Sequence, residues 1–380
     1  MKKDNTNFSQ AILPLREEID RIDAKILELL ARRQDQVDQV MDLKKAHQQP
    51  VFHPAREEDL IFRLRTRSAD AGLDPDFMED LYRLILKQSR KSQTDQMGLR
   101  GLAQQRKVLV VGGAGQMGAL FADLFHRTGY GVNILSEKDW DRAEELCRDI
   151  DLALISVPIE KTGEVVKQLS PHLPPKALLA DLTSIKKEPM AAMLAAHDGP
   201  VMGLHPLFGP TSALLDKQIV VVTPGRDGEA GQWLVEQLSL WGAVIVPSTP
   251  AEHDAVMELV QALRHFATFC FGRFLHEKQA DLQRTLEFSS PIYRLELDMV
   301  GRLFAQDAGL YAQIIFATPE RRELLKDYID CLSRHREMLD TDNREEFMDK
   351  FQEIAQWFGP FSVQAMREST FLINKLIERF

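Results

Sequence analysis

The chain has 380 residues, of which 44% are hydrophobic and 27% are charged, and its formal net charge is −10. This length suffices for two or three domains with cores of their own. The negative charge argues against a nucleic-acid-binding surface. The first residues lack the apolar run of a signal peptide, and no apolar run reaches the roughly 18 residues of a membrane span. Three widely spaced cysteines predict a cytoplasmic protein with no disulfide or zinc framework.

The N-terminal quarter of the chain predicts an all-helical domain over residues 1–93. Apolar residues recur at three- and four-residue steps between residues 9 and 47. No glycine or proline interrupts residues 15–49, which predicts a helix of about 30 residues, or roughly 45 Å. A second helix is predicted over residues 55–71 and a third over residues 75–93. Three such helices make a poor globule, so the pattern alone indicates a dimerising hairpin or coiled coil.

Cationic side chains inside this pattern suggest a binding site. Arg33 and Lys44 lie eleven residues apart, about 20° out of phase on an ideal helix, so they share a face at roughly 16 Å. Two long cations that bracket a gap suit a dianion with separated carboxylates; the alternative is solvated surface charge. Arg16 lies about 100° from that face and would more easily serve a site in a dimer partner. Further polar groups on the second and third helices are Arg56, Glu57, Ser89 and Gln93.

Residues 9–93 resemble the all-helical, intertwined chorismate mutase family, through Leu13-Pro-Leu-Arg16, Leu29-Leu-Ala-Arg-Arg33 and the polar positions just named. The resemblance implies rearrangement of chorismate to prephenate in a homodimer. It also implies that these polar residues bind the two carboxylates and the ether oxygen, with Arg16 crossing from the partner subunit. The chain departs from the family at His53, where stand-alone members carry an Asp four residues before the Glu that matches Glu57.

Residues 94–106 are polar, contain two glycines and predict a linker. From residue 107 short apolar runs alternate with helical stretches such as 116–128, 161–169 and 229–241. This alternation predicts a mostly parallel, Rossmann-like α/β domain over residues 107–249. The predicted strands are Val108–Val111, Val132–Leu135, Leu152–Val157, Leu178–Leu182, Val201–Leu204, Ile219–Thr223 and Ala243–Val246.

A glycine loop follows the first of these strands. Gly113, Gly115 and Gly118 have the G-x-G-x-x-G spacing, and an apolar helical pattern follows. The first glycine allows a tight turn, the second lets a pyrophosphate approach the backbone, and the third lets the helix pack on the strand. Gln116 and Met117 open that helix, so the stretch predicts dinucleotide binding. The acid expected after the second strand is Glu137 of Ser136-Glu137, with Asp139 nearby. Glu137 lies one residue later than usual, which favours NAD over NADP without fixing the choice.

Three later strand ends carry candidate site residues. Ser156-Val157-Pro158 ends the third predicted strand, where a ligand of an open α/β sheet is expected. Ser184 follows the fourth strand and His205 ends the fifth. A single histidine at a strand end is more often structural than catalytic. Beside Ser184 at the cofactor edge, however, its pKa near 6.5 suits a general base.

Beyond Pro250 the strand signal stops, and residues 250–380 predict a helical block that completes a substrate cleft and a dimer interface. Arg294 and Arg302 lie within about 80° of each other on one predicted helix. Arg302 suits a partly buried carboxylate receptor, with a salt bridge to an acid as the alternative. For His253 and His265 a packed or capping role is expected. The predicted helices are 251–278, 279–288, 291–305, 319–339, 343–357 and 361–379.

Residues 107–380 resemble bacterial prephenate dehydrogenases, through Gly112-Gly-Ala-Gly-Gln-Met-Gly118, Gly203-Leu-His-Pro-Leu-Phe-Gly-Pro210, Gln261-Ala-Leu-Arg-His-Phe-Ala-Thr-Phe269 and the stretch from Ser289 to Phe304. Together with the mutase-like start, the whole chain resembles the bifunctional T-protein family of tyrosine biosynthesis.

This second resemblance implies NAD-dependent oxidative decarboxylation of prephenate to 4-hydroxyphenylpyruvate, with inhibition by tyrosine. His205 would accept the proton of the 4-hydroxyl, Ser184 would hydrogen-bond that hydroxyl, and Arg302 would hold a carboxylate. Two alternatives remain at this point. One is another NAD(P)-dependent dehydrogenase, acting on arogenate or a hydroxyacid, and the other is a non-enzymatic, dinucleotide-sensing regulator.

Overall fold

The computed structural model describes residues 4–46, 54–97, 101–102, 106–210 and 215–377; the side chains of residues 4–11, 45–46, 54–55 and 91–97 are outside this description. His53 lies outside the described residues. The chain forms two compact units. The first unit comprises Met1–Ser156, Val166–Leu182 and Met193–Pro247, and the second comprises Val157–Val165, Thr183–Ala192 and Ser248–Phe380.

The N-terminal region is helical, as predicted. It contains α1 (Asp4–Ala46), α2 (Pro54–Asp70) and α3 (Pro75–Met97). The first helix has 43 residues rather than about 30, because it begins at Asp4 and continues through Pro14. Arg65 of α2 forms ion pairs with Asp76 (2.6 Å) and Glu79 (2.7 Å) of α3, so these charges help to close the α2–α3 hairpin.

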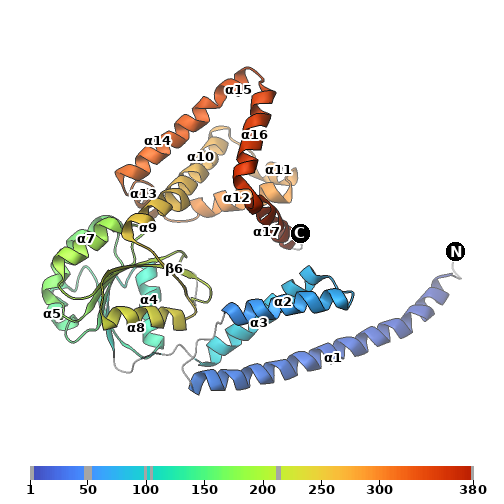
Figure 1. The fold of residues 1–380 in the computed structure, drawn as a ribbon, viewed down its shortest axis with the longest axis horizontal. Coiled ribbons are helices and arrows are strands. Elements are labelled where there is room, and N and C mark those ends of the chain that lie inside the picture. Colours follow the sequence, from blue (N-terminus) through green and yellow to red (C-terminus); the bar gives the residue numbers. More distant parts are fainter. Residues whose placement is uncertain (1–3, 47–53, 98–100, 103–105, 211–214, 378–380) are drawn as a thin grey trace. The chain divides into compact units, whose positions relative to one another are not determined.

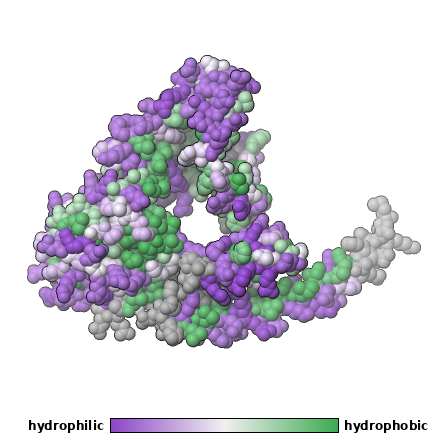
Figure 2. All heavy atoms as spheres, in the orientation of Figure 1, coloured by the Kyte–Doolittle hydropathy of each residue, from purple (hydrophilic) through white to green (hydrophobic). Residues whose placement is uncertain are grey.

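One side of α1 exposes a long apolar stripe. Figure 2 shows hydrophobic residues along this helix. The exposed side chains include Leu15 (65%), Ile19 (55%), Ile22 (47%), Ile26 (50%) and Leu29 (59%). A contiguous apolar surface of this kind marks an interaction site rather than an ordinary solvent-facing helix.

The sheet has seven strands in the order β2-β1-β3-β4-β5-β6-β7. Figure 1 labels one of them, β6. All neighbours are parallel except β5 and β6, so the prediction of a mostly parallel sheet is confirmed. The strands are β1 Lys107–Val111, β2 Gly131–Leu135, β3 Leu152–Ile155, β4 Leu178–Asp181, β5 Val201–Pro206, β6 Ile219–Arg226 and β7 Val244–Pro247.

Alternate strand residues bury one face of the sheet under two helices. These helices are α4 (Gln116–Arg127) and α8 (Glu229–Leu240), which contribute Phe125 and Trp233 to the core. The rings of Phe125 and Trp241 meet edge to face at 5.0 Å. The other elements between the strands are η1 Trp140–Arg142, α5 Ala143–Leu146, η2 Ile159–Lys161, α6 Thr162–Leu169, η3 Ser170–His172 and α7 Lys187–Ala196.

The predicted linker is anchored to the nucleotide-binding region at Leu102. The backbone N–H of Leu102 donates to the Tyr130 hydroxyl and to the Gln237 side-chain oxygen, both at 3.0 Å. The hydroxyl of Tyr130 donates to Gln237 at 2.5 Å and accepts from the indole N–H of Trp233 at 3.1 Å. This buried network fixes the backbone of Leu102.

The C-terminal region is helical, as predicted, and several of its helices begin at side-chain caps. Thr249, Ser290 and Thr318 each accept a hydrogen bond from the backbone three residues later, and each is followed by proline. The helices are α9 Pro250–Met257, α10 Arg264–Glu277, α11 Leu282–Glu287, α12 Pro291–Phe304, α13 Ala308–Ile315, α14 Pro319–Arg334, α15 Arg336–Asp340, α16 Arg344–Phe358 and α17 Pro360–Ile377.

Three details of this region differ from the prediction. The helix predicted over 251–278 contains a π-helical segment, η4 (Glu258–Leu263), between α9 and α10. The helix α13 was not predicted, and the stretch 319–339 is divided at His335. Within the described part of the chain, no helix combines the length and apolarity that crossing a membrane requires.

Candidate functional site

The glycine loop joins the end of β1 to the start of α4. Gly112 has a φ of +82°, in the left-handed region that favours glycine. A Cβ on Gly118 would lie 2.6 Å from the Gly112 carbonyl oxygen, and one on Gly113 would lie 2.9 Å from the Ile134 side chain. The close approach of loop, helix and β2 therefore requires glycine at these positions, as the spacing predicts.

The first turn of α4 suits an anionic ligand. Gly115 is the N-cap, and no side chain caps it, so the backbone N–H groups of this turn remain available to a phosphate. Gln116 is exposed, whereas Met117 is partly buried against the sheet core. These features fit the pyrophosphate of a dinucleotide.

The end of β3 adjoins the same loop. The backbone N–H of Ser156 donates to the Val111 carbonyl at 2.8 Å, which places Ser156 beside the end of β1. Val157 and Pro158 then lead into η2. Parallel strands end together at the ligand edge of a doubly wound sheet, so Ser156 occupies the position predicted for it.

Beyond β2, Ser136 takes the position where an acid is usual, and Glu137 is exposed. The side chain of Asp139 folds back to this point. Its carboxylate accepts hydrogen bonds from the Ser136 backbone N–H at 3.0 Å and from the Ser136 hydroxyl. These bonds from Ser136 lower the pKa of Asp139. Sequence reasoning placed an acid near the ribose but did not identify this pair.

The loop that carries Ser184 is held by buried charges of the second unit. Asp254 of α9 accepts hydrogen bonds from the backbone N–H groups of Lys186 (2.7 Å) and Lys187 (2.9 Å). Arg321 of α14, 1% exposed, donates to the Ser184 carbonyl at 3.2 Å and to the Ile314 carbonyl at 2.5 Å. Sequence reasoning missed Asp254 and Arg321, because no local pattern links them to this loop.

Asp254 is charged within this cluster. Burial raises its pKa, but hydrogen bonds from His253, Lys187 and Lys186 outweigh that effect and leave the pKa below its usual value. His253, 2% exposed, lies with its Nδ1 2.8 Å from the Asp254 carboxylate. His253 therefore has the packed position expected for it.

His205 lies on β5 and is 3% exposed. The strands β4 and β5 are parallel neighbours, and Asp181 pairs with Gly203, two residues before His205. The loop with Ser184 leaves β4 just beyond Asp181. The topology thus brings the ends of the two strands that carry these candidates to one edge of the sheet.

Arg294 and Arg302 both lie on α12, as predicted. Arg294 donates to the Leu286 carbonyl at 2.9 Å. Arg302 is exposed in the single chain, so the expectation that its side chain is partly buried is wrong there. His265 packs edge to face on Tyr311 at 4.8 Å, and burial lowers its pKa from 6.5 to about 4. A packed role fits His265 as well.

The helical region brings several predicted mutase residues together. Arg33 of α1 donates to the hydroxyl of Ser89 on α3 at 2.9 Å. Burial lowers the pKa of Lys44, and the nearby Glu57 carboxylate opposes that shift. Glu57 also forms a 2.5 Å ion pair with Arg90, a buried residue that sequence reasoning did not single out.

The remaining mutase candidates are less defined. Arg16 and Arg56 are exposed on α1 and α2. Gln93 lies on α3, and its side chain is outside the described part.

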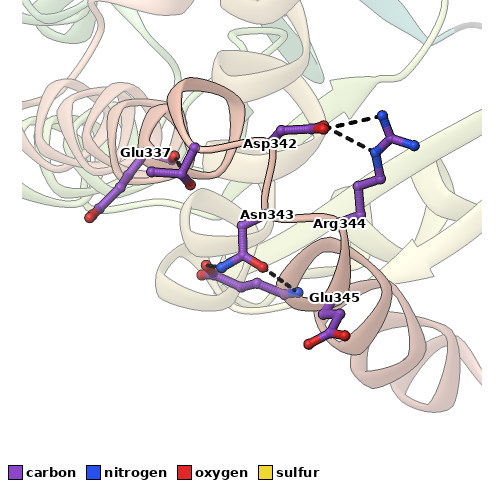
Figure 3. Close-up of a pocket in the computed structure, with 7 residues that line it drawn as sticks. Glu337, Asp342, Asn343, Arg344 and Glu345 are labelled. Atoms are coloured by element: carbon purple, nitrogen blue, oxygen red, sulfur yellow. Dashed lines mark hydrogen bonds and ion pairs between the residues drawn. The ribbon is translucent and has the colours of Figure 1, made fainter.

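A surface pocket at the α15–α16 turn contains none of the predicted site residues (Figure 3). It has a volume of about 540 Å³ and is lined by Glu337, Asp342, Asn343 and Arg344, among others. Asp342 and Arg344 form an ion pair of 3.1 Å across the turn. Among the residues that the structure describes, no group of histidine, cysteine or acidic side chains could hold a metal ion.

Three family models match successive parts of the chain. Residues 15–94 match type II chorismate mutases, residues 131–246 the nucleotide-binding domain of prephenate dehydrogenase, and residues 249–353 its dimerisation domain. The order is that of the predicted mutase, Rossmann-like and helical regions, so the predicted fold class is confirmed. The predicted domain boundaries stay predictions.

Two relatives resemble nearly the whole chain. The T-protein of Enterobacter agglomerans is 43% identical over 361 residues, which cover 95% of this chain and 96% of that protein. The T-protein of Haemophilus influenzae is 40% identical over 370 residues, covering 97% and 98%. The mutase match also decides against the arogenate-type dehydrogenase and the regulator, since neither predicts such a start.

A solved structure shares the fold of the part of the chain that follows the mutase helices. Prephenate dehydrogenase from Aquifex aeolicus, in complex with hydroxyphenyl propionate and NAD+, has a TM-score of 0.56 and 19% identity. The match covers 70% of this chain and 99% of that one.

Proposed function

Because the chain belongs to the T-protein family, which joins a chorismate mutase to a prephenate dehydrogenase, we propose roles for its individual side chains. The enzyme rearranges chorismate to prephenate. It then converts prephenate to 4-hydroxyphenylpyruvate by oxidation and decarboxylation, with NAD as the cofactor. The side-chain roles below rest on the geometry described above.

In the mutase site, Arg33 and Lys44 hold the carboxylates and stabilise the charge that develops on the ether oxygen. The 2.9 Å bond between Arg33 and Ser89 supports this role, because it orients the guanidinium before substrate arrives. Glu57, Arg56 and Gln93 complete the polar surroundings. A rearrangement of this type needs no covalent intermediate, so preorganised cations are sufficient.

In the dehydrogenase site, His205 accepts the proton of the prephenate hydroxyl and Ser184 orients that hydroxyl. The observation that carries this proposal is the double clamp on the Ser184 loop by Asp254 and Arg321. A loop fixed by buried charges is preorganised for orientation of a substrate. Arg302 and Arg294 bind the carboxylates of prephenate.

The cofactor residues are the glycine loop (Gly113, Gly115, Gln116, Met117, Gly118), the acids after β2, and Ser156-Val157-Pro158. When bound, NAD accepts the hydride that leaves C4 of the substrate. The chain's own contribution is to bind the pyrophosphate on the open first turn of α4.

The enzyme acts as a homodimer in the cytoplasm. The exposed apolar stripe of α1 supports dimerisation, and Arg16 at its start would reach the partner's mutase site. Three free cysteines support a reducing compartment. Inhibition by tyrosine, which the family resemblance implies, is part of the same proposal.

Incubation of the enzyme with chorismate and NAD, following NADH absorbance and 4-hydroxyphenylpyruvate, tests the proposed sites together. Arg33→Ala should strongly slow turnover from chorismate but not from added prephenate, whereas His205→Asn should strongly slow NADH production from both and let prephenate accumulate. The assignments are wrong if either variant blocks the other step. Flat activity curves with added tyrosine would refute the inhibition.

A further inference from the structure

The glycine loop does not determine whether the protein binds NAD or NADP. The residues that follow β2 bear on that choice. The Leu135 carbonyl, at the end of β2, accepts a hydrogen bond of 2.9 Å from the Gly112 backbone N–H. The end of β2 is therefore held against the glycine loop. In this fold the ribose next to the adenine binds at that point, and its 2′-substituent distinguishes the two cofactors.

Ser136 stands at this position and presents two donors, a backbone N–H and a hydroxyl. A hydroxyl and a backbone N–H side by side would suit a 2′-phosphate, because phosphate binding uses such donors. In this chain both donors are already bonded to one carboxylate oxygen of Asp139. The backbone N–H of Asp139 returns a bond to the Ser136 carbonyl at 3.1 Å, which closes the turn.

The Asp139 carboxylate thus occupies the two donors that would otherwise bind a 2′-phosphate. Its hydrogen bonds favour the ionised form, as the lowered pKa of Asp139 indicates. A 2′-phosphate would lose the donors and meet a like charge, and a like-charge contact weakens binding. A ribose 2′-hydroxyl can instead donate to the second carboxylate oxygen.

We propose that Asp139, acting through Ser136, sets the preference of this enzyme for NAD over NADP, and that Glu137, the acid suggested by the sequence pattern, does not. This inference rests on the cofactor site proposed above.

The test measures dissociation constants of NADH and NADPH by isothermal titration calorimetry on the full-length enzyme. Asp139→Asn removes the charge and keeps the side-chain shape, and it should lower the ratio of the NADPH to the NADH constant by about tenfold or more. Asp141→Asn is the matched control, because it removes an exposed carboxylate two residues away that has no bond to Ser136. It should change the ratio less than about threefold.

Two outcomes overturn the proposal. One is an unchanged ratio in Asp139→Asn, measured on protein whose mutase activity shows that it is folded. The other is a tenfold fall of the same ratio of dissociation constants in Glu137→Gln.

A separate variant tests the cofactor site itself. Gly115 has φ −74° and ψ 158°, an ordinary N-cap conformation, and a Cβ there would lie 3.3 Å from the Gly112 carbonyl oxygen. With a small local shift Gly115→Asp can therefore cap α4 while it places a carboxylate where the pyrophosphate binds. Both dinucleotides should then bind at least about 100-fold more weakly. If neither affinity changes, the glycine-loop site is wrong, and so is the role proposed for Asp139. If both affinities fall, the cofactor site is supported, and the Asp139→Asn and Glu137→Gln variants then decide which acid sets the cofactor preference.

Discussion

The carboxylate of Asp254 accepts a hydrogen bond of 2.7 Å from the backbone N–H of Lys186, 68 residues earlier in the chain. The N–H of Lys187 donates to the other oxygen of the same carboxylate at 2.9 Å. A side chain from α9 thus caps the start of α7 and, together with Arg321, fixes the loop that carries Ser184. Buried bonds to a charged acceptor are among the stronger hydrogen bonds in proteins.

Asp254→Asn should weaken this clamp, because an amide offers one acceptor oxygen and turns a donor toward a backbone N–H. We expect a loss of about 1–3 kcal/mol in stability and at least a roughly tenfold fall in dehydrogenase kcat. Thermal unfolding and both activity assays measure these effects. Glu252→Gln, an exposed acid on the same helix, is the control, and mutase activity should stay normal. A dehydrogenase kcat of wild-type size in Asp254→Asn contradicts the clamp.

His205→Asn should depress dehydrogenase kcat by about 10²–10⁴-fold, the usual effect of removing a general base. Mutase activity should remain near normal, since the two sites lie in different parts of the chain. Initial rates with saturating prephenate and NAD provide the measurement. A fully active variant would exclude His205 as the base.

Arg33→Ala should reduce mutase kcat/KM by roughly 10- to 150-fold, because hydrogen bonds from a charged donor contribute about 1.5–3 kcal/mol. Arg32→Ala is a close control, since the neighbouring arginine is exposed on the same helix and was not assigned to the site. The decline of chorismate absorbance gives both rates. Equal losses in the two variants would point to general charge effects instead of a site.

Arg302→Ala should mainly raise KM for prephenate, because loss of a carboxylate receptor weakens ground-state and transition-state binding alike. The exposed position of Arg302 predicts little change in stability. Steady-state kinetics with varied prephenate separate KM from kcat. An unchanged KM removes Arg302 from the substrate site.

His265 predicts a pH-dependent loss of stability. Its pKa is about 4 in the folded protein and near 6.5 when exposed, because burial, with Arg264 and Arg321 nearby, disfavours the charged form. Between these values only the unfolded chain binds the proton, so stability falls as pH falls from 6.5 toward 4, by at most about 1.4 kcal/mol per pH unit. His265→Phe keeps a ring on Tyr311 and should show a shallower decline of melting temperature over this range. Parallel curves for both proteins would contradict the shift.

Regular elements were predictable because their signals are local. Each of the seven strands is an apolar run of few residues, and helix starts such as Ser290-Pro291 carry a cap and a proline in sequence. The antiparallel direction of β6 was not predictable, since an apolar run has the same pattern in both directions. The π-helical segment at Glu258–Leu263 was not predictable either, because it contains no glycine or proline that would indicate a break in the helix.

The site was predictable only as far as residue types at strand ends. His205 and Ser184 stood out by position after apolar runs, but the bonds that fix the Ser184 loop come from α9 and α14, far along the chain. The pairing of Ser136 with Asp139 spans three residues. The sequence pattern favoured Glu137 because this acid lies one residue from the usual position, and it does not show that the side chain of Asp139 folds back onto Ser136.

The anchor at Leu102 limits how far the two enzymes can separate. Its backbone N–H is fixed by Tyr130 and Gln237, while α3 ends at Met97. Even fully extended, the five steps between these residues span at most about 18 Å. The mutase helices are thus joined to the dehydrogenase by a short tether, so prephenate is released by the same molecule that consumes it. At such a distance tethering alone raises the local concentration of the intermediate, without any tunnel between the sites.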